Sequence, residues 1–167
     1  MKPPEPFTWF VDRSLGRKIV VDLRAAGFQV EEHSAHFVDD APDAEWLAEA
    51  GRRGWAVLTK DKAVRRNALE LAAILAGDVA CFSLGHGNLK AEQMALAFVA
   101  ARSRIEKVLR RYDSPMTASV TSTGHVSVLM ANGELLPSRS PSSRRGGRNQ
   151  QAPQHLLSHS IDCPTSA

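Results

Sequence analysis

The stretch FTWFVDRSLGRKIVVDLRAAGFQVEEH, residues 7–33, decides the fold of this chain. Its first five residues are mostly apolar and rich in aromatic and β-branched side chains, which is typical of a buried strand. Residues 15–26 then place apolar side chains three and four apart, which predicts a helix capped by Ser14 and ended by Gly27. Residues 28–33 predict a second strand. This order predicts a parallel pair of strands joined by a right-handed crossover.

The same alternation of strand and helix continues to residue 130. We expect a helix over 44–53, with Asp43 as its N-cap, a strand over 55–59, a helix over 67–77, a strand over 79–84, a helix over 89–111, and a β-hairpin from 116–122 and 125–130. Strands that alternate with helices predict an α/β fold of three layers, α/β/α, with a mainly parallel central sheet and the hairpin added at its C-terminal end. In such sheets, sites form beyond the carboxyl ends of the strands.

The composition changes at about residue 131. Residues 132–167 are rich in Ser, Pro, Gly, Gln and Arg and have hardly any apolar periodicity. Such a segment cannot bury enough apolar surface to offset the ~1–2 kcal/mol of backbone entropy that ordering each residue costs. We therefore predict one domain over 1–131 and a disordered tail over 132–167. A solvated tail is favoured for residues 138–148, with electrostatic RNA binding as the alternative.

Length and composition exclude several classes of protein. The 167 residues are 43% hydrophobic, but their longest apolar runs are far shorter than the roughly 20 residues that span a bilayer. The first residues do not have the pattern of a signal peptide, so we expect a cytoplasmic protein without membrane association. Two cysteines, Cys81 and Cys163, are too few for a disulfide framework or a zinc site built from cysteine.

Charge is distributed unevenly along the chain. Residues 1–49 carry ten acidic and five basic side chains, a net charge of −5, whereas residues 50–130 carry twelve basic and six acidic ones, a net charge of +6. The remaining residues add +2, which gives the total of +3. A mildly basic chain is compatible with a nucleic-acid partner.

Three aspartates follow three of the predicted strands. Asp12 directly follows the first strand, Asp43 opens the helix after the second, and Asp61 lies two residues beyond the third. Because these positions meet at one edge of a parallel sheet, we expect the carboxylates to converge, which is unfavourable unless a cation lies among them. Mg²⁺ or Mn²⁺ prefers such oxygen ligands and supports hydrolysis of phosphodiester bonds. Each aspartate also has a plainer explanation: a strand end, a helix cap and a turn.

Three sequence motifs resemble PIN-domain ribonucleases. They are FVDRSLG at 10–16, DAEWL at 43–47 and GWAVLTKD at 54–61. The resemblance extends over about residues 7–130 and is strongest to small PIN-like proteins related to the VapC-type toxins of bacterial toxin–antitoxin operons. It implies an acidic pocket that binds Mg²⁺ or Mn²⁺ and cleaves RNA, with catalytic and metal-binding roles for Asp12, Asp43 and Asp61.

The family pattern has a further acidic ligand without a clear counterpart in this chain. That ligand is a glutamate on a helix between the first two aspartates, and Asp39, Asp40 or Glu45 could replace it. Of the histidines, we expect His33 and His36 to be exposed loop residues rather than ligands.

Basic residues lie close to the three aspartates in the sequence. We expect contacts to RNA phosphates from Arg13, Lys60, Lys62 and Arg65. The alternative for the two lysines is that they only offset the charge of the carboxylates. The tryptophans lie on elements expected to pack, so they predict core positions.

The expected function is that of a metal-dependent endoribonuclease, the toxin of a toxin–antitoxin pair. RNA would be its substrate, and an antitoxin protein and a second copy of the chain are possible partners. The alternative is a PIN-like module that binds RNA or protein with little or no catalysis, which the absent fourth acid motivates. A receiver domain ranks last, because it would need paired acids after the first strand and only Asp12 is there.

Overall fold

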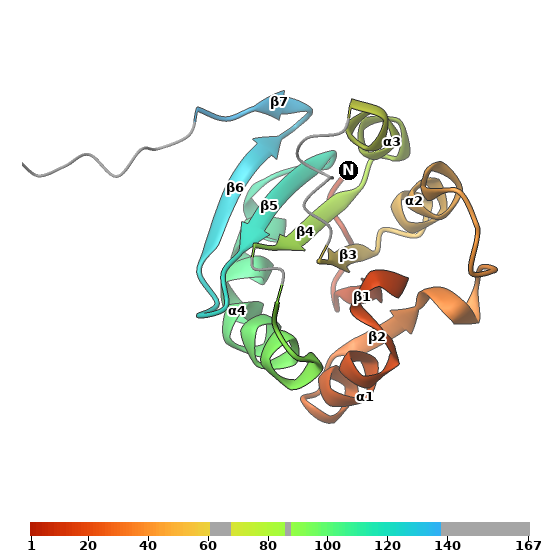
Figure 1. Ribbon diagram of the computed structural model, residues 1–167. Coiled ribbons are helices and arrows are strands. Elements are labelled where there is room, and N and C mark those ends of the chain that lie inside the picture. The colour runs from red at the N-terminus through yellow and green to blue at the C-terminus, as the bar shows by residue number, and fades with distance from the viewer. Residues whose placement is uncertain (61–67, 86–87, 138–167) are drawn as a thin grey trace, which may run out of the picture.

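The computed structural model describes residues 1–60, 68–85 and 88–137. Its seven strands form one sheet in the order β2-β1-β3-β4-β5-β6-β7 (Figure 1). The strands are β1 (Thr8–Val11), β2 (Gln29–Glu32), β3 (Ala56–Thr59), β4 (Ala80–Leu84), β5 (Met116–Val120), β6 (Val126–Ala131) and β7 (Glu134–Leu135). Strands β1 to β5 run parallel to one another, whereas β6 pairs antiparallel with β5 and β7 pairs antiparallel with β6. The predicted hairpin is confirmed as β5 and β6.

Helices cover both faces of this sheet. They are α1 (Arg17–Ala25), α2 (Asp43–Arg52), α3 (Ala68–Gly77) and α4 (Ala91–Arg111). Helices α1 and α4 pack on one face and α2 and α3 on the other, which confirms the predicted three-layer α/β/α fold (Figure 1). Each face has its own cluster of buried apolar side chains. None of these helices is long and apolar enough to cross a membrane.

Alternation along β1 distributes its side chains between the two layers. Trp9 and Val11 pack among the residues of α1 and α4, whereas Phe10 packs on the opposite face. There the Phe10 ring stacks on Trp46 and on Trp55, each at 5.5 Å between ring centroids. Offset stacking of buried rings adds to the gain from burying their area. The predicted core positions of the tryptophans are thereby confirmed.

The structure corrects two predicted helix starts. A 3-10 turn at Arg13–Leu15 precedes α1, and Gly16, at φ 80°, separates the two. Ser14 therefore lies inside the turn and does not cap α1. Helix α2 begins at Asp43 itself with Pro42 as its N-cap, so the predicted capping role of Asp43 is wrong.

Strand β7 lies just beyond the predicted domain boundary. Its two residues, Glu134–Leu135, pair with β6, so the sheet ends four residues beyond the expected 1–131. The tail from residue 138 lies outside the described residues, and its disorder stays a prediction.

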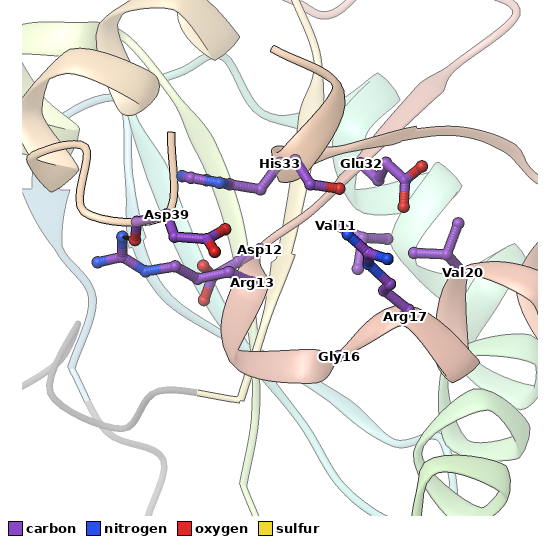
Figure 2. A pocket seen from close by; sticks show the side chains of 10 residues that line it. Val11, Asp12, Arg13, Gly16, Arg17, Val20, Glu32, His33 and Asp39 are labelled. Carbon is purple, nitrogen blue, oxygen red and sulfur yellow. Dashed lines mark hydrogen bonds between the residues drawn. The ribbon is translucent and has the colours of Figure 1, made fainter. Parts of the chain in front are cut away.

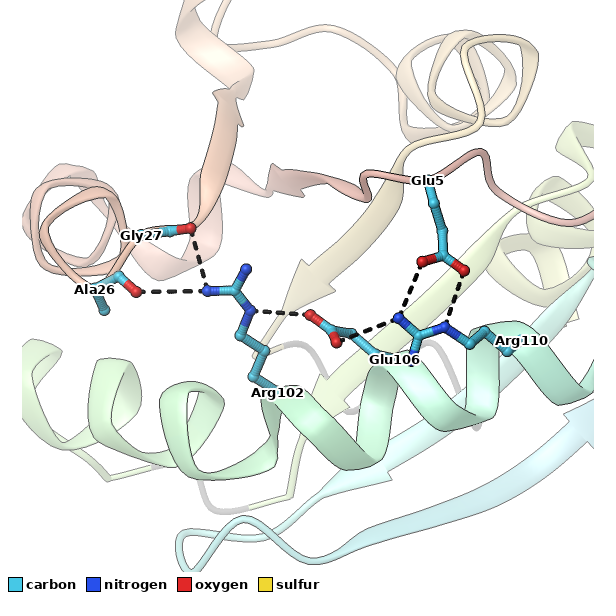
Figure 3. A network of polar contacts seen from close by, with 6 residues as sticks. All are labelled: Glu5, Ala26, Gly27, Arg102, Glu106 and Arg110. Atoms are coloured by element: carbon cyan, nitrogen blue, oxygen red, sulfur yellow. Dashed lines mark hydrogen bonds and ion pairs between the residues drawn. The ribbon is translucent and has the colours of Figure 1, made fainter.

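A row of ion pairs attaches α4 to the start of the chain and to the end of α1 (Figure 3). Arg102 donates to the carbonyl oxygens of Ala26 and Gly27 and pairs with Glu106 at 3.0 Å. Glu106 also pairs with Arg110, which forms a two-pronged ion pair with Glu5 at 2.9 and 3.0 Å. The arginines late in α4 thus join separate segments of the chain.

Helices α2 and α3 meet where both carry glycine. A Cβ built at Gly51 would overlap the carbonyl oxygen of Gly77, and one at Gly77 would lie 3.0 Å from the carbonyl oxygen of Leu47. The helices therefore approach each other more closely than any side chain there allows.

We predict that Gly51→Ala lowers the free energy of unfolding by about 2 kcal/mol, because the added methyl forces the helices apart. Alanine is intrinsically better than glycine in a helix, so a loss of stability measures the contact and not the propensity. Urea unfolding measures the free energy of unfolding, and Ala76→Ser, at an exposed position of α3, is the control. Unchanged or raised stability of Gly51→Ala would contradict the prediction.

Candidate functional site

Asp12 lies at the carboxyl end of β1, where its backbone N–H donates to the carbonyl oxygen of Leu58 at 3.0 Å. Its side chain is on the same face of the sheet as Phe10, and the residue is only 7% exposed. One carboxylate oxygen, Oδ2, accepts hydrogen bonds from the hydroxyl of Thr59 at 2.8 Å and from that of Ser14 at 2.5 Å. A buried carboxylate is costly unless it is hydrogen-bonded, and these two hydroxyls meet that requirement.

Asp43 is held at the start of α2 by two donors. Its Oδ1 accepts a hydrogen bond from the indole N–H of Trp46 at 3.0 Å and lies 3.7 Å from the guanidinium of Arg13. Arg13 also donates to the carbonyl oxygens of Asp39 and Ala41, in the loop that leads into α2. A negative charge in the first turn of a helix is favourable with respect to its dipole. Arg13 thus links the end of β1 to the start of α2.

Asp12 and Asp43 line one cavity of about 100 Å³ together with Glu70. Each carboxylate comes from a different element: Asp12 follows β1, Asp43 begins α2, and Glu70 lies in the first turn of α3. Glu70 was not among the expected ligands, because those were acids that closely follow strands, whereas Glu70 lies one turn into the next helix. Because α3 follows β3, the same edge rule would have found it.

The other predicted site residues are placed as follows. Glu45 lines a different cavity, with Arg52 and Arg53, and Asp40 is exposed and lines neither that cavity nor the one with Asp12. Lys60 is exposed next to Thr59 at the end of β3. The remaining predicted residues lie outside the described ones: Asp61, Lys62 and Arg65.

The donor set at this cavity is suited to a hard divalent cation. Asp12, Asp43 and Glu70 supply carboxylate oxygens, the ligands that Mg²⁺ and Mn²⁺ prefer. Within residues 1–60, 68–85 and 88–137, however, no three His, Cys, Asp or Glu side chains are arranged so that they could hold a metal ion. The carboxylate oxygens are therefore of the kind that such an ion prefers. To surround the ion, Asp61 would have to join them or the three side chains would have to move closer together.

A second cavity, of about 170 Å³, lies against Asp12 and Arg13 as well (Figure 2). His33 is one of its lining residues and is 2% exposed, which corrects its predicted exposure. Its ring packs against Phe10, Phe37 and Trp46, with centroids 5.4 to 6.2 Å away. Neither ring nitrogen has a hydrogen-bond partner among the residues described. Burial lowers the pKa of His33, and the nearby charge of Arg13 lowers it further, which favours the neutral form of the ring.

The sheet order, the helices on both faces and the carboxylates at the edge of β1 define a PIN-like domain. The family model described as "PIN like domain" matches residues 8–86, which include β1 to β4 and the described residues of the carboxylate cavity. The curated protein "Putative ribonuclease VapC45" of Mycobacterium tuberculosis is 32% identical over 125 residues, covering 72% of this chain and 90% of that protein. This chain therefore belongs to the VapC-type family of PIN-like domains. No solved structure is significantly similar to it.

We predict that the stability of the protein falls as the pH is lowered through about 6.5, and that His33→Phe reduces this fall. The unfolded chain binds a proton at His33 near the ordinary pKa of 6.5, whereas the folded chain resists it because its own pKa is lower. The contribution of His33 to the free energy of unfolding is therefore fully present above pH 6.5 and declines below it, where the unfolded chain takes up a proton at His33. Urea unfolding at about pH 7.5 and about pH 5.5 measures the difference.

His125→Gln is the control, because His125 is exposed. The same pH dependence in His33→Phe as in the unmodified chain would show that another group causes it.

Proposed function

We propose that this chain is a metal-dependent endoribonuclease that hydrolyses RNA phosphodiester bonds at the cavity of Asp12, Asp43 and Glu70. One observation carries the proposal: carboxylates from three separate elements line a single cavity at the carboxyl edge of the sheet. Such convergence is unfavourable without a cation to offset it. The printed name of the curated relative, a ribonuclease, supports the same activity.

We assign Mg²⁺ or Mn²⁺ to this cavity, with Asp12, Asp43 and Glu70 as ligands and Asp61, two residues beyond β3 in the sequence, as the fourth. Such an ion, when bound, stabilises the charge that develops on the phosphate and makes water a better nucleophile. The role of the chain is to hold these oxygens in place before the substrate arrives. Preorganised carboxylates do not have to reorient during the reaction.

The hydrogen bonds of the site are suited to that task. Thr59 and Ser14 both donate to the same oxygen of Asp12, so the orientation of the carboxylate is fixed by two elements at once. Trp46 and Arg13 fix Asp43 in a comparable way. We expect these four side chains to act as positioning residues for the two carboxylates.

RNA phosphates would be bound by basic residues around the cavity. Lys60 is exposed at the end of β3, and Lys62 and Arg65 follow it in the sequence. Arg13 has a second task, because its guanidinium already contacts the loop before α2 and Asp43. We expect Lys60, Lys62 and Arg65 to contribute mainly to RNA binding, and Arg13 both to RNA binding and to the position of Asp43.

Membership in the VapC-type family leads us to propose that the chain is the toxin of a toxin–antitoxin pair, inhibited by a cognate protein and able to form a homodimer. A second function is a PIN-like module that binds RNA or protein with little catalysis. It is favoured by the lack of three metal-binding side chains in suitable positions within the described part of the chain. Cleavage assays distinguish the two functions.

We predict that Asp12→Asn and Asp43→Asn each reduce Mn²⁺-dependent RNA cleavage by more than about 100-fold, beyond the 10–100-fold typical of residues that only support a ligand. Folding should persist, because an asparagine oxygen still accepts hydrogen bonds. Cleavage of a labelled single-stranded RNA measures the loss.

Asp113→Asn, an exposed position before β5 at the opposite edge of the sheet, is the control and should cleave normally. A folded Asp12→Asn variant with normal cleavage would contradict the proposed site. RNA binding without cleavage by the unmodified chain would favour the binding module.

We also predict that Trp46→Phe lowers the affinity for Mn²⁺ and the cleavage rate by 10–100-fold, because Asp43 loses the indole N–H that holds it. Trp55→Phe is a matched control: it removes the same atoms from a ring that also stacks on Phe10 but does not contact Asp43. Titration with Mn²⁺ and cleavage assays measure both variants. Equal effects in the two variants would show that the loss comes from core packing.

A further inference from the structure

The basic side chains of α4 lie on two flanks of the helix and are balanced differently. On the flank beside the end of α1, Arg102 and Arg110 both pair with Glu106 (Figure 3). On the other flank, Arg104 donates to the carbonyl oxygen of Gly124, in the turn that joins β5 and β6. The first flank therefore has its own acidic partner, and the second is held against the hairpin by a neutral one.

Arg104, Lys107 and Arg111 form a stripe along that second flank, which we call the α4 stripe. They follow one another at spacings of three and four residues, so they share one face of the helix and span about 10 Å along its axis. All three residues are exposed. Within residues 1–60, 68–85 and 88–137, none of them forms an ion pair with a carboxylate. The α4 stripe is thus a line of positive charge that the described part of the chain does not balance.

The helix itself does not account for this line of charge. Basic side chains are favourable in the last turn of a helix, which explains Arg111, but Arg104 and Lys107 lie before that turn. Like charges three or four residues apart also repel each other, which weakens a helix. A polyanion bound from outside would balance the α4 stripe as Glu106 balances the opposite flank.

The α4 stripe begins at the same edge of the sheet as the carboxylate cavity. Gly124 follows the carboxyl end of β5, and β5 runs parallel to β1, whose carboxyl end is followed by Asp12. Three strand spacings separate β1 from β5, which is about 14 Å. Helix α4 packs on the face opposite to Phe10, so a strand of RNA bound at the cavity would cross the edge of the sheet and continue along α4.

We propose that the α4 stripe binds the phosphate backbone of the RNA at a distance from the bond that is cut. The proposal rests on the proposed function. A line of basic side chains matches the repeated charge of a nucleic-acid backbone and contacts phosphates without reading the bases. The α4 stripe therefore adds affinity for long RNA of any sequence, and the position of the cut is left to the cavity.

The first experiment measures RNA binding by the full chain without metal, so that no RNA is cut. A single-stranded RNA of about 16 nucleotides is titrated at several salt concentrations. Each phosphate contact to a single strand contributes about −0.7 to the slope of log K against log salt. The double variant Lys107→Gln, Arg111→Gln should therefore flatten this slope by about 1.4 and lower the affinity about tenfold near physiological salt.

Two matched controls separate the α4 stripe from the charge of the helix as a whole. The double variant Arg102→Gln, Arg110→Gln removes the same charge from the paired flank and should leave the slope unchanged. The double variant Lys107→Arg, Arg111→Lys keeps both charges and should also leave it unchanged. Circular dichroism checks that each variant is folded.

Three results of the binding experiment would overturn the proposal. One is an unchanged slope in the folded Lys107→Gln, Arg111→Gln variant. Another is an equal flattening in the variant of the paired flank. The third is a loss of binding to polyglutamate, an acidic polypeptide, with RNA binding unchanged, which would assign the α4 stripe to an acidic protein.

The second experiment separates this proposal from the nuclease proposal. Cleavage with Mn²⁺ is followed for RNAs of about 4 and about 16 nucleotides. The Lys107→Gln, Arg111→Gln variant should raise the KM for the longer RNA about tenfold, leave kcat unchanged and cut the shorter RNA normally. RNA binding that depends on the α4 stripe, in a chain that cuts neither RNA, would support the stripe and overturn the nuclease proposal. Cleavage of both RNAs with the same KM in the variant and the unmodified chain would overturn the α4 stripe alone.

Discussion

The hydrogen bonds that two hydroxyls donate to one oxygen of Asp12 are the interaction on which the site depends. They bring together the end of β1, the turn before α1 and the end of β3 around a carboxylate that is almost completely buried. Burying such a group without partners would cost several kcal/mol, so Ser14 and Thr59 make the position of Asp12 tolerable as well as fixed. Both cavities border on this residue. The chemistry of the edge is thus organised around a charge that the fold has already stabilised.

Arg13 extends that organisation to the next element. As the residue after Asp12, it reaches across to the loop before α2 and to Asp43, and so couples two acidic residues that are 31 positions apart in the sequence. A guanidinium can do this because it presents several donors in one plane. The position of Asp43 therefore depends on the end of β1 as much as on its own helix.

Some of the fold and of the site could be predicted from the sequence. The alternation of strand-like and helix-like hydrophobic repeats predicted the three layers of the fold. Because parallel strands bring their carboxyl ends to one edge of the sheet, the sequence also predicted that Asp12 and Asp43 approach each other. Glu70 was missed because it lies one turn into a helix. The role of Ser14 was missed because its hydroxyl donates to the Asp12 carboxylate and does not cap α1. His33 was predicted to be exposed, yet its ring packs beneath Trp46. Such tertiary contacts have no signature in the sequence.

The close contact of α2 and α3 at Gly51 and Gly77 has a mechanical consequence. The glycines lie near the last residues of the two helices, whereas Asp43 and Glu70 lie in their first turns. Because the two helices touch through their backbones at this contact, a side chain that separates them there would also change the separation of the two carboxylates.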